Sequence, residues 1–348
     1  MLTKQVHAAV AADNGNRIAA YDLIRVFAAF SVVVVHVASP VSSDYNDQSL
    51  FNQQIIQLYQ AVFRSGIPLF LMLSGALLLP YATSLQFVKR RVLRVLIPLS
   101  FWTLIFTLAK NQLSTLSLSG YFNNLLDGAA PHYWYVYFIL VLYFTMPLIY
   151  VVLSKIKVNV KYLFVLTLIA TFASYFVKDS LEPYSSALEY SIYILYLILG
   201  YKLATEPDNM RFLSIQVGIL LFLMGTLVTL IGSTLLSTQS GIQNDLFYES
   251  TGTHIFIKAI GAWIILHKIS EKVSVYWQDF LRSISSYTFG IYLMHTLVLE
   301  HLLISRLGIS YTFFTPFVGV ILTAFLTFVF SILIAALLKK LPYGSFTL

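Results

Sequence analysis

Three ionisable residues lie in the first apolar stretch of the chain, where a charge is costly. Asp22, Arg25 and His36 all fall within the segment YDLIRVFAAFSVVVVHVASP, and a charge near the bilayer centre costs about 2.5–3.5 kcal/mol. A helix would project Arg25 and His36 from nearly one face, about three turns and 16 Å apart. Because imidazole exchanges protons near neutral pH, His36 is suited to act as a general base. The structural alternative is an Arg25 that reaches the membrane interface and a neutral, hydrogen-bonded His36.

A second group of basic residues stands where a later apolar segment begins. The sequence FVKRRVLRVLIP places Arg91 and Arg94 three residues apart, on one face of a helix, with Lys89 and Arg90 beside them. Lys89 and Arg90 are explained as an anchor at the cytoplasmic membrane surface. Arg94 enters the apolar run, and forked guanidinium donors suit a ligand rich in phosphate.

Aromatic and histidine residues gather near the expected outer face. His132, Tyr133 and Trp134 open an apolar segment, where aromatic residues usually form an interfacial belt. His132 and Trp134 are equally suited to form a platform for a sugar ring. His295 follows Tyr292 in an apolar setting, and a hydrogen-bonded structural histidine is the favoured interpretation.

Three of the histidines are conceivable zinc ligands, because His36, His132 and His254 all fall toward the expected outer face. No close ligand spacing such as H-x-x-x-H supports such a site, so we expect no metal. The chain has no cysteine, which excludes a thiol nucleophile, a disulfide and a thiolate metal site.

The composition requires that membrane helices position these residues. Of 348 residues, 58% are hydrophobic and only 11% are charged, whereas soluble domains carry roughly a quarter charged residues. A soluble enzyme and a nucleic-acid binder are thereby excluded, and a bundle of about ten transmembrane helices is expected. The ten apolar segments are 18–39, 60–80, 92–110, 133–153, 161–178, 186–204, 212–234, 251–268, 284–304 and 313–338.

The Lys and Arg residues predict the orientation of these segments. Ten spans with both termini in the cytoplasm place most of the 22 Lys and Arg residues inside, as positive loops resist translocation. The exceptions are Arg64, Lys110, Lys178, Lys258 and Arg306. The segment at 251–268 is the weakest: it carries Lys258, so we expect it to be tilted or packed inside the bundle.

The sequence predicts one all-α membrane domain. Residues 1–17 are expected to form a cytoplasmic tail, residues 18–340 the transmembrane domain, and residues 341–348 a second cytoplasmic tail.

Taken in series, these segments resemble the acyltransferase 3 family of integral membrane acyltransferases. Five stretches carry the resemblance, in family order: D-x-x-R followed by a histidine (Asp22, Arg25, His36), G-I-P-L-F-L-M-L-S-G (Gly66 to Gly75), R-R-x-x-R-x-x-x-P (Arg90, Arg91, Arg94, Pro98), H-x-W with a later P-L (His132, Trp134, Pro147), and G-I-Y-L-M-H (Gly290 to His295). No motif was matched in the eighth segment.

The resemblance implies transfer of an acyl group, commonly acetyl, from cytoplasmic acyl-coenzyme A to a carbohydrate hydroxyl near the outer face. It implies that His36 and Arg25 are catalytic, with Asp22 in support, and that Arg90, Arg91 and Arg94 bind the coenzyme A phosphates. His132, Tyr133, Trp134 and His295 are the acceptor-side candidates. No permanently bound cofactor is expected. The stand-alone type, without a fused serine-hydrolase-like domain, and a bacterial inner membrane are also implied.

Two other classes of function are open. A transporter or flippase of a glycan or small polar solute would also use buried Arg and His residues, although the sequence shows no paired halves. A purely structural membrane subunit makes no use of Arg25, Arg94 and His36. The general base and a covalent acyl-histidine relay at His36 are alternatives that the sequence leaves open. The acceptor, the acyl group and the oligomeric state are likewise open.

Overall fold

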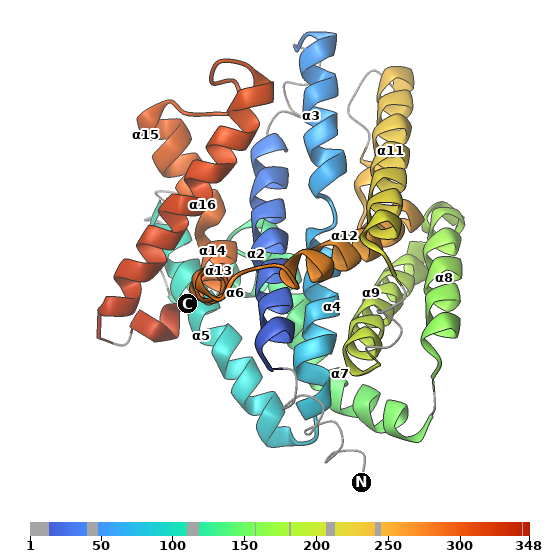
Figure 1. Cartoon of the computed structure of the whole chain (residues 1–348). Coiled ribbons are helices and arrows are strands. Elements are labelled where there is room, and N and C mark those ends of the chain that lie inside the picture. Colours follow the sequence, from blue (N-terminus) through green and yellow to red (C-terminus); the bar gives the residue numbers. More distant parts are fainter. Residues whose placement is uncertain are drawn as a thin grey trace.

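The computed structural model describes residues 14–39, 48–109, 118–156, 158–180, 182–206, 213–240, 245–342 and 344–348, and every regular element in these ranges is helical (Figure 1). The longer helices are α2 (Asn14–Ala38), α3 (Leu50–Phe63), α4 (Gly66–Leu78), α5 (Leu85–Ala109), α6 (Leu118–Asp127), α7 (Trp134–Lys155), α8 (Val160–Ser180), α9 (Glu182–Thr205), α11 (Ile215–Ser240), α12 (Thr253–Ser270), α13 (Val275–Ser285), α14 (Thr288–Leu297) and α16 (Pro316–Lys340). The short ones are η3 (Leu79–Tyr81), η5 (Pro131–Tyr133), η6 (Leu246–Tyr248), the π-helix η7 (Val298–Ile304), α15 (Ser305–Leu307) and η8 (Gly344–Thr347).

Eight helical stretches among the described residues are long and apolar enough to cross a membrane: Ala19–Ala38, Leu50–Tyr81, Leu85–Ala109, Pro131–Lys155, Ser186–Thr205, Ile215–Thr238, Thr288–Leu307 and Pro316–Lys340. They overlap eight of the ten segments expected from the sequence. The fifth expected segment corresponds to a shorter apolar helix, Val160–Phe176. The eighth corresponds to α12.

Helix is the form that these apolar segments must take, because lipid offers no partner for backbone N–H and C=O groups. The helices continue even through internal proline residues. Pro98 lies inside α5 and Pro147 inside α7 without ending either helix, as neighbouring helices in a membrane bundle can satisfy the freed carbonyls.

The second membrane stretch is a broken helix. Its two halves, α3 and α4, are separated by Arg64 and Ser65. Pro68 has no N–H and so cannot bond the Arg64 carbonyl four residues earlier. Helical bonding resumes with Leu69 N–H, which donates to the Ser65 carbonyl at 3.1 Å. The break therefore places two helix termini in the middle of one membrane stretch.

Helices α4 and α9 touch backbone to backbone. A Cβ atom built on Gly75 would lie 1.8 Å from the Leu197 carbonyl oxygen, and one built on Gly200 would lie 2.0 Å from the Met72 carbonyl oxygen. Small residues of this kind let membrane helices approach closely and gain van der Waals contact. The pair fixes α4, whose residues line the site described below.

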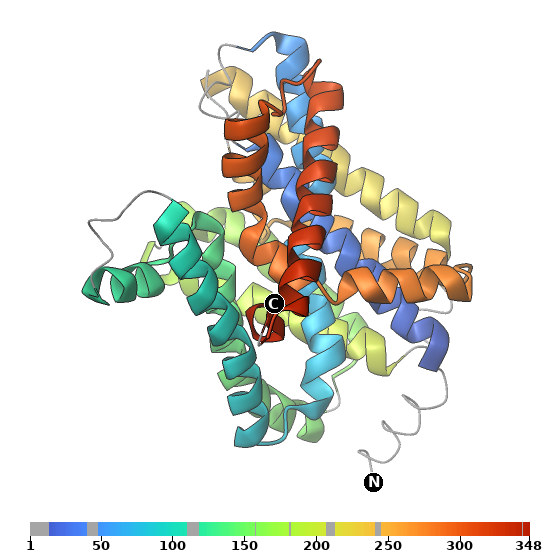
Figure 2. The ribbon, with the colours of Figure 1, turned by 90° about the vertical axis from the view of Figure 1, so that its left-hand side faces the viewer.

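Helix α12 runs across the molecule, whereas α2, α3 and α16 run along it (Figures 1 and 2). Most of its residues are buried, including Lys258. This agrees with the expectation that the segment carrying Lys258 is packed inside the bundle. The buried position explains why a helix with an internal cation need not meet the requirements of a lipid-facing span.

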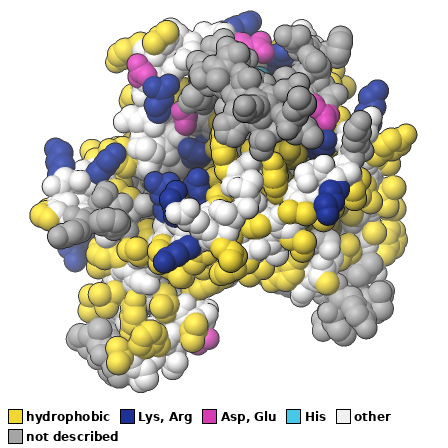
Figure 3. All heavy atoms as spheres, turned by 90° about the horizontal axis from the view of Figure 1, so that it is seen from below, with side chains coloured by type: hydrophobic (Ala, Val, Ile, Leu, Met, Phe, Trp, Pro, Cys, Tyr) yellow, Lys and Arg dark blue, Asp and Glu magenta, His cyan; other side chains and the backbone are white. Residues whose placement is uncertain are grey.

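One end of the molecule is basic, and we call it the basic end. Residues Arg90, Arg91, Arg94, Lys339 and Lys340 lie there, where α5 begins and α16 ends. Viewed from this end, Lys and Arg side chains gather near the middle of the face (Figure 3). The end at which α3 begins lies opposite (Figure 1).

Candidate functional site

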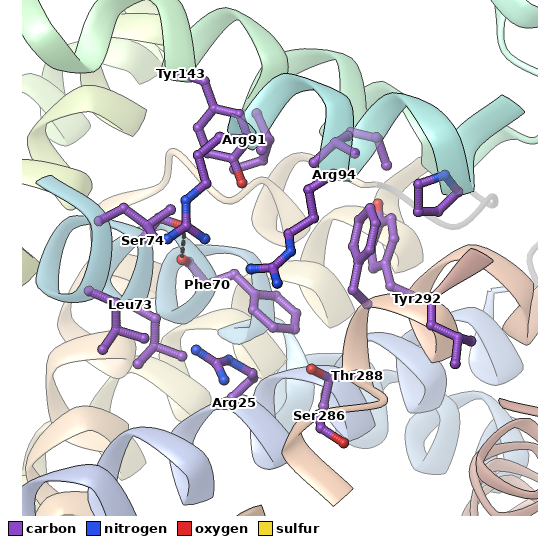
Figure 4. Close-up of a pocket in the computed structure, with 18 of the residues that line it drawn as sticks. Arg25, Phe70, Leu73, Ser74, Arg91, Arg94, Tyr143, Ser286, Thr288 and Tyr292 are labelled. Carbon is purple, nitrogen blue, oxygen red and sulfur yellow. Dashed lines mark hydrogen bonds between the residues drawn. The ribbon is translucent and has the colours of Figure 1, made fainter. Parts of the chain in front are cut away.

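A cavity of about 970 Å³ opens among α2, α4, α5, α7 and α14 near the basic end. Arg25, Arg90, Arg91 and Arg94 line it, and Figure 4 shows Arg25 of α2 facing Arg91 and Arg94 of α5. The cavity wall also includes apolar side chains of α4 and α5 and the rings of Tyr135, Tyr143 and Tyr292. A strongly basic mouth thus continues into a mostly apolar interior.

Arg25 is held in place by a network that joins α2 to the end of α13. Its Nη1 donates to the Ser285 hydroxyl at 3.1 Å, and this hydroxyl donates to Asp22 Oδ1 at 2.5 Å. Arg25 and Asp22 are also ion-paired at 3.7 Å. About a third of the Arg25 side chain stays exposed, so it remains able to contact a ligand in the cavity.

The arginines of α5 have no acidic partner of this kind. Among the described residues, no carboxylate lies within ion-pair distance of Arg90, Arg91 or Arg94. The Arg91 guanidinium lies 5.7 Å from the Phe87 ring. All three arginines also line an adjoining cavity of about 530 Å³. Unpaired guanidinium groups around a cavity are suited to an anionic ligand, phosphate above all.

Three histidines from distant parts of the chain form a cluster at the inner end of this region. The ring centroids of His36 and His295 are 4.9 Å apart, those of His132 and His295 4.6 Å, and those of His36 and His132 5.6 Å. The cluster adjoins the cavity wall, because the Tyr292 hydroxyl donates to the His132 carbonyl at 2.5 Å. The sequence placed His132 and His295 on the acceptor side without placing either beside His36.

Hydrogen bonds fix the proton position on one of these rings. His295 Nδ1 lies 2.7 Å from the Tyr292 carbonyl oxygen, which can only accept, so Nδ1 carries the proton. In the neutral ring Nε2 is then an acceptor, and it is buried with no partner among the described residues. Both His132 ring nitrogens are likewise buried and make no well-aligned hydrogen bond with the described residues, although the backbone of Tyr292 and Leu293 lies beside the ring. Such groups are costly inside a protein and mark a candidate reaction site.

His254 lies apart from this cluster. Its Nδ1 contacts the Tyr175 hydroxyl at 2.6 Å, and its Nε2 contacts the Phe247 carbonyl at 2.8 Å. Both nitrogens are used in these bonds, so the conceivable zinc set of His36, His132 and His254 is not assembled. Across the described ranges, no group of three potential ligand residues is arranged to hold a metal ion.

The other acceptor-side candidates take different positions. Tyr133 is fully buried, and its hydroxyl donates to the Leu293 carbonyl at 3.3 Å. Trp134 is 44% exposed and stacks on Tyr193, with ring centroids 6.2 Å apart. Of the candidates predicted from the sequence, the structure therefore brings His132 and His295 to His36, and Trp134 packs against α9 instead.

Ser285, which bonds both Asp22 and Arg25, was missed by the sequence reasoning. It is 263 residues from Asp22 in the chain, and no spacing rule connects the two. The remaining signal is local: Ser285 stands shortly before the G-I-Y-L-M-H stretch that ends at His295. Tyr143, which also lines the cavity, carried no sequence signal either, and Lys339 was expected only as one of the basic residues on the cytoplasmic side.

The fold and the site define a multi-pass, all-helical membrane protein with a basic cavity that leads to buried histidines. The chain matches the acyltransferase 3 family model, described as an acyltransferase domain, over residues 18–336. It therefore belongs to the acyltransferase 3 family and is a membrane acyltransferase. No match was found among curated proteins or among solved structures.

Proposed function

We propose that the protein transfers a short acyl group, most simply acetyl, from acyl-coenzyme A to a hydroxyl of a cell-surface or lipid-linked carbohydrate. The observation that carries the proposal is one continuous region. It has unpaired arginines at its mouth and, behind the Tyr292 ring, a cluster of three histidines. This arrangement suits a long ligand with phosphates at one end and a reactive thioester at the other.

The donor binds at the basic end. Arg91 and Arg94 contact its phosphates by charge-assisted hydrogen bonds, and Arg25 contacts them from the opposite wall. The thin pantetheine arm extends along the apolar cavity toward Tyr292 and Tyr135. Acyl-coenzyme A is cytoplasmic and positive segments are retained there, so the basic end faces the cytoplasm of a bacterium and the protein lies in the inner membrane.

His36 is the general base in this proposal. It accepts the proton of the acceptor hydroxyl while the oxygen attacks the thioester carbonyl. The new C–O bond forms, the C–S bond breaks, and coenzyme A leaves as a thiolate that takes up a proton. His295 Nε2 and the His132 ring nitrogens lie where they can share the proton held by His36.

The test is acyl transfer by inside-out vesicles that contain wild-type protein or the His36→Ala variant. The vesicles receive acetyl-labelled coenzyme A and the glycan pool of the host. Loss of a general base typically costs 10²–10⁴-fold in rate, so we expect label in the glycan fraction with wild type and almost none with the variant.

His301→Ala is the matched control, because His301 contacts the Ala109 carbonyl away from the cluster. We expect it to transfer at the wild-type rate at equal expression. Full transfer by His36→Ala would remove His36 from the chemistry.

A transporter remains the second candidate, because the broken helix α3–α4 resembles the discontinuous helices of transporters. Coenzyme A binding separates the two functions. Purified protein that binds coenzyme A supports the transferase, and a transporter of glycans has no reason to bind it.

A further inference from the structure

We propose that Arg64, at the break between α3 and α4, binds an anionic group carried by the acceptor. The identification of the ligand as the acceptor rests on the proposed function. The anion site itself rests on the contacts that Arg64 makes. The proposal assigns to the middle of the second membrane stretch a cationic site that is separate from the basic end and selective for a carboxylate or a phosphate.

Arg64 is held in a defined position by two neighbours. Its Nε donates to Gln60 Oε1 at 2.9 Å, and its guanidinium lies 4.7 Å from the centroid of the Tyr248 ring. Tyr248 is itself buried, at 2% exposed. Among the described residues, the Arg64 side chain has no other hydrogen-bond partner, so its two outer nitrogens remain available for a planar anion.

Gln60 also connects Arg64 to the turn of α2 that carries His36. Gln60 Nε2 lies 3.2 Å from the Ser39 hydroxyl and 3.4 Å from the Val35 carbonyl. Val35 precedes His36 on α2, and Ser39 follows directly after the end of that helix. Through Gln60, Arg64 is linked to the end of α2 that carries His36, which places the cation at the depth of the proposed chemistry.

A second cation lies beside Arg64 without neutralising it. Lys258 is fully buried, its ammonium donates to the Ala61 carbonyl at the end of α3, and its charge interacts with that of Arg64. Among the described residues, neither cation has a carboxylate within ion-pair distance. Asp245, the acidic residue whose charge reaches Arg64, is exposed and lies beyond that distance.

Two neighbouring cations without a counter-ion, one fully buried and one partly buried, are unfavourable inside a membrane protein. An anion supplied from outside would relieve this cost. Lys258 already has a structural partner at the end of α3, whereas Arg64 retains exposed surface. The missing anion is therefore assigned to Arg64, with Lys258 adding to the positive potential.

The test measures binding of three simple probes to purified protein at constant ionic strength: glucuronate, glucose 1-phosphate and glucose. We expect at least one acid, but not glucose, to raise the melting temperature of the wild type. R64Q should bind that acid at least tenfold more weakly. A response to glucuronate identifies a carboxylate site for an acidic sugar, and a response to glucose 1-phosphate identifies a phosphate site.

Two further variants complete the design. R306Q removes an exposed arginine outside the site and should bind like the wild type. R64K keeps the charge but loses the planar fork, so its affinity should be intermediate. An unchanged rise in melting temperature with coenzyme A would show that each variant is folded and keeps its donor site.

Equal responses of the wild type to glucose and to both acids would overturn the proposal. So would undiminished acid affinity in R64Q, or in R64K if R64Q does not fold. Because the readout is binding, it is independent of acyl transfer. Protein that binds an acid through Arg64 but transfers no label would contradict the proposed function alone.

Discussion

At the scale of single residues, the site depends on hydroxyl and imidazole groups that orient other groups. Arg25 is the clearest case, since Ser285 accepts its hydrogen bond and passes another to Asp22. Ser285 is buried and lies at the end of α13. Ser285 is therefore a positioning residue for Arg25. Its substitution would displace the Arg25 side chain without removing any arginine from the cavity.

Replacement of Ser285 by alanine should weaken donor binding and leave the chemical step intact. Without the intervening hydroxyl, Asp22 would shorten its 3.7 Å ion pair with Arg25 and draw the guanidinium away from the cavity. We expect the Kd for coenzyme A to rise about tenfold, which corresponds to about 1.4 kcal/mol. Titration calorimetry gives the Kd, and single-turnover transfer at saturating donor gives the chemical rate.

Ser285→Thr retains the hydroxyl and should restore most of the affinity. Ser283→Ala, at an exposed position on the same helix, should change nothing. A drop in the single-turnover rate with an unaltered Kd would assign Ser285 a different role.

At the same scale, the sequence identified residues that line the site better than it identified their contacts. Asp22, Arg25, Arg91, Arg94 and His36 stood out because their charge or polarity was costly within apolar stretches, and the structure gathers all but His36 around one mouth. The neighbours of His36 could not be predicted. They come from η5 and α14, and no local pattern encodes a contact across more than 90 residues.

At the scale of elements, close packing of α4 and α9 keeps the cavity wall in place. Gly75→Ala would put a methyl group against the Leu197 backbone, and a backbone cannot move aside as a side chain can. We expect a loss of stability of about 1–3 kcal/mol, as for other overpacked sites. Thermal unfolding in detergent measures it.

Gly218→Ala is the comparison for this prediction. Its new methyl group would meet the side chain of Ile264 at 3.0 Å, and that side chain can shift. We therefore expect a smaller loss. Equal melting temperatures for Gly75→Ala and the wild type would show that the α4–α9 contact is looser than described.

The length of the apolar segments predicted most of the membrane helices. It was a poorer guide for helices that are enclosed by other helices rather than by lipid. Helix α12 shows the reason: it is enclosed by its neighbours, so its sequence tolerates Lys258. Helix α13 was not foreseen. It carries the exposed apolar residues Val275, Tyr276, Trp277 and Phe280 together with polar residues, in a segment too short to span a membrane.

At the scale of the whole molecule, the basic end and the opposite end differ in charge, and this difference predicts the orientation. The chain has no cysteine, so a single introduced cysteine can report the orientation without background labelling of native thiols. Thr83→Cys lies before α5 at the basic end, and Thr312→Cys lies before α16 at the opposite end; both positions are exposed.

A membrane-impermeant maleimide should label Thr83→Cys in inside-out vesicles and Thr312→Cys in intact spheroplasts. The physical reason is that positive segments stay on the cytoplasmic side. The reverse pattern would place the arginine-lined cavity on the outer side and remove cytoplasmic acyl-coenzyme A as the donor. Labelling of both positions in spheroplasts would contradict the arrangement of α5 and α16.

The contact between Lys258 and the end of α3 also sets an order of events during synthesis. The two partners are 197 residues apart, and ribosomes add about 5–20 residues per second, so Lys258 follows Ala61 by about 10–40 seconds. During that interval α3 and α4 enter the bilayer without this contact, and the Ala61 carbonyl must be hydrated or shielded by the insertion machinery. Nascent chains halted before α12 should therefore remain bound to that machinery, while chains that include α12 are released into lipid.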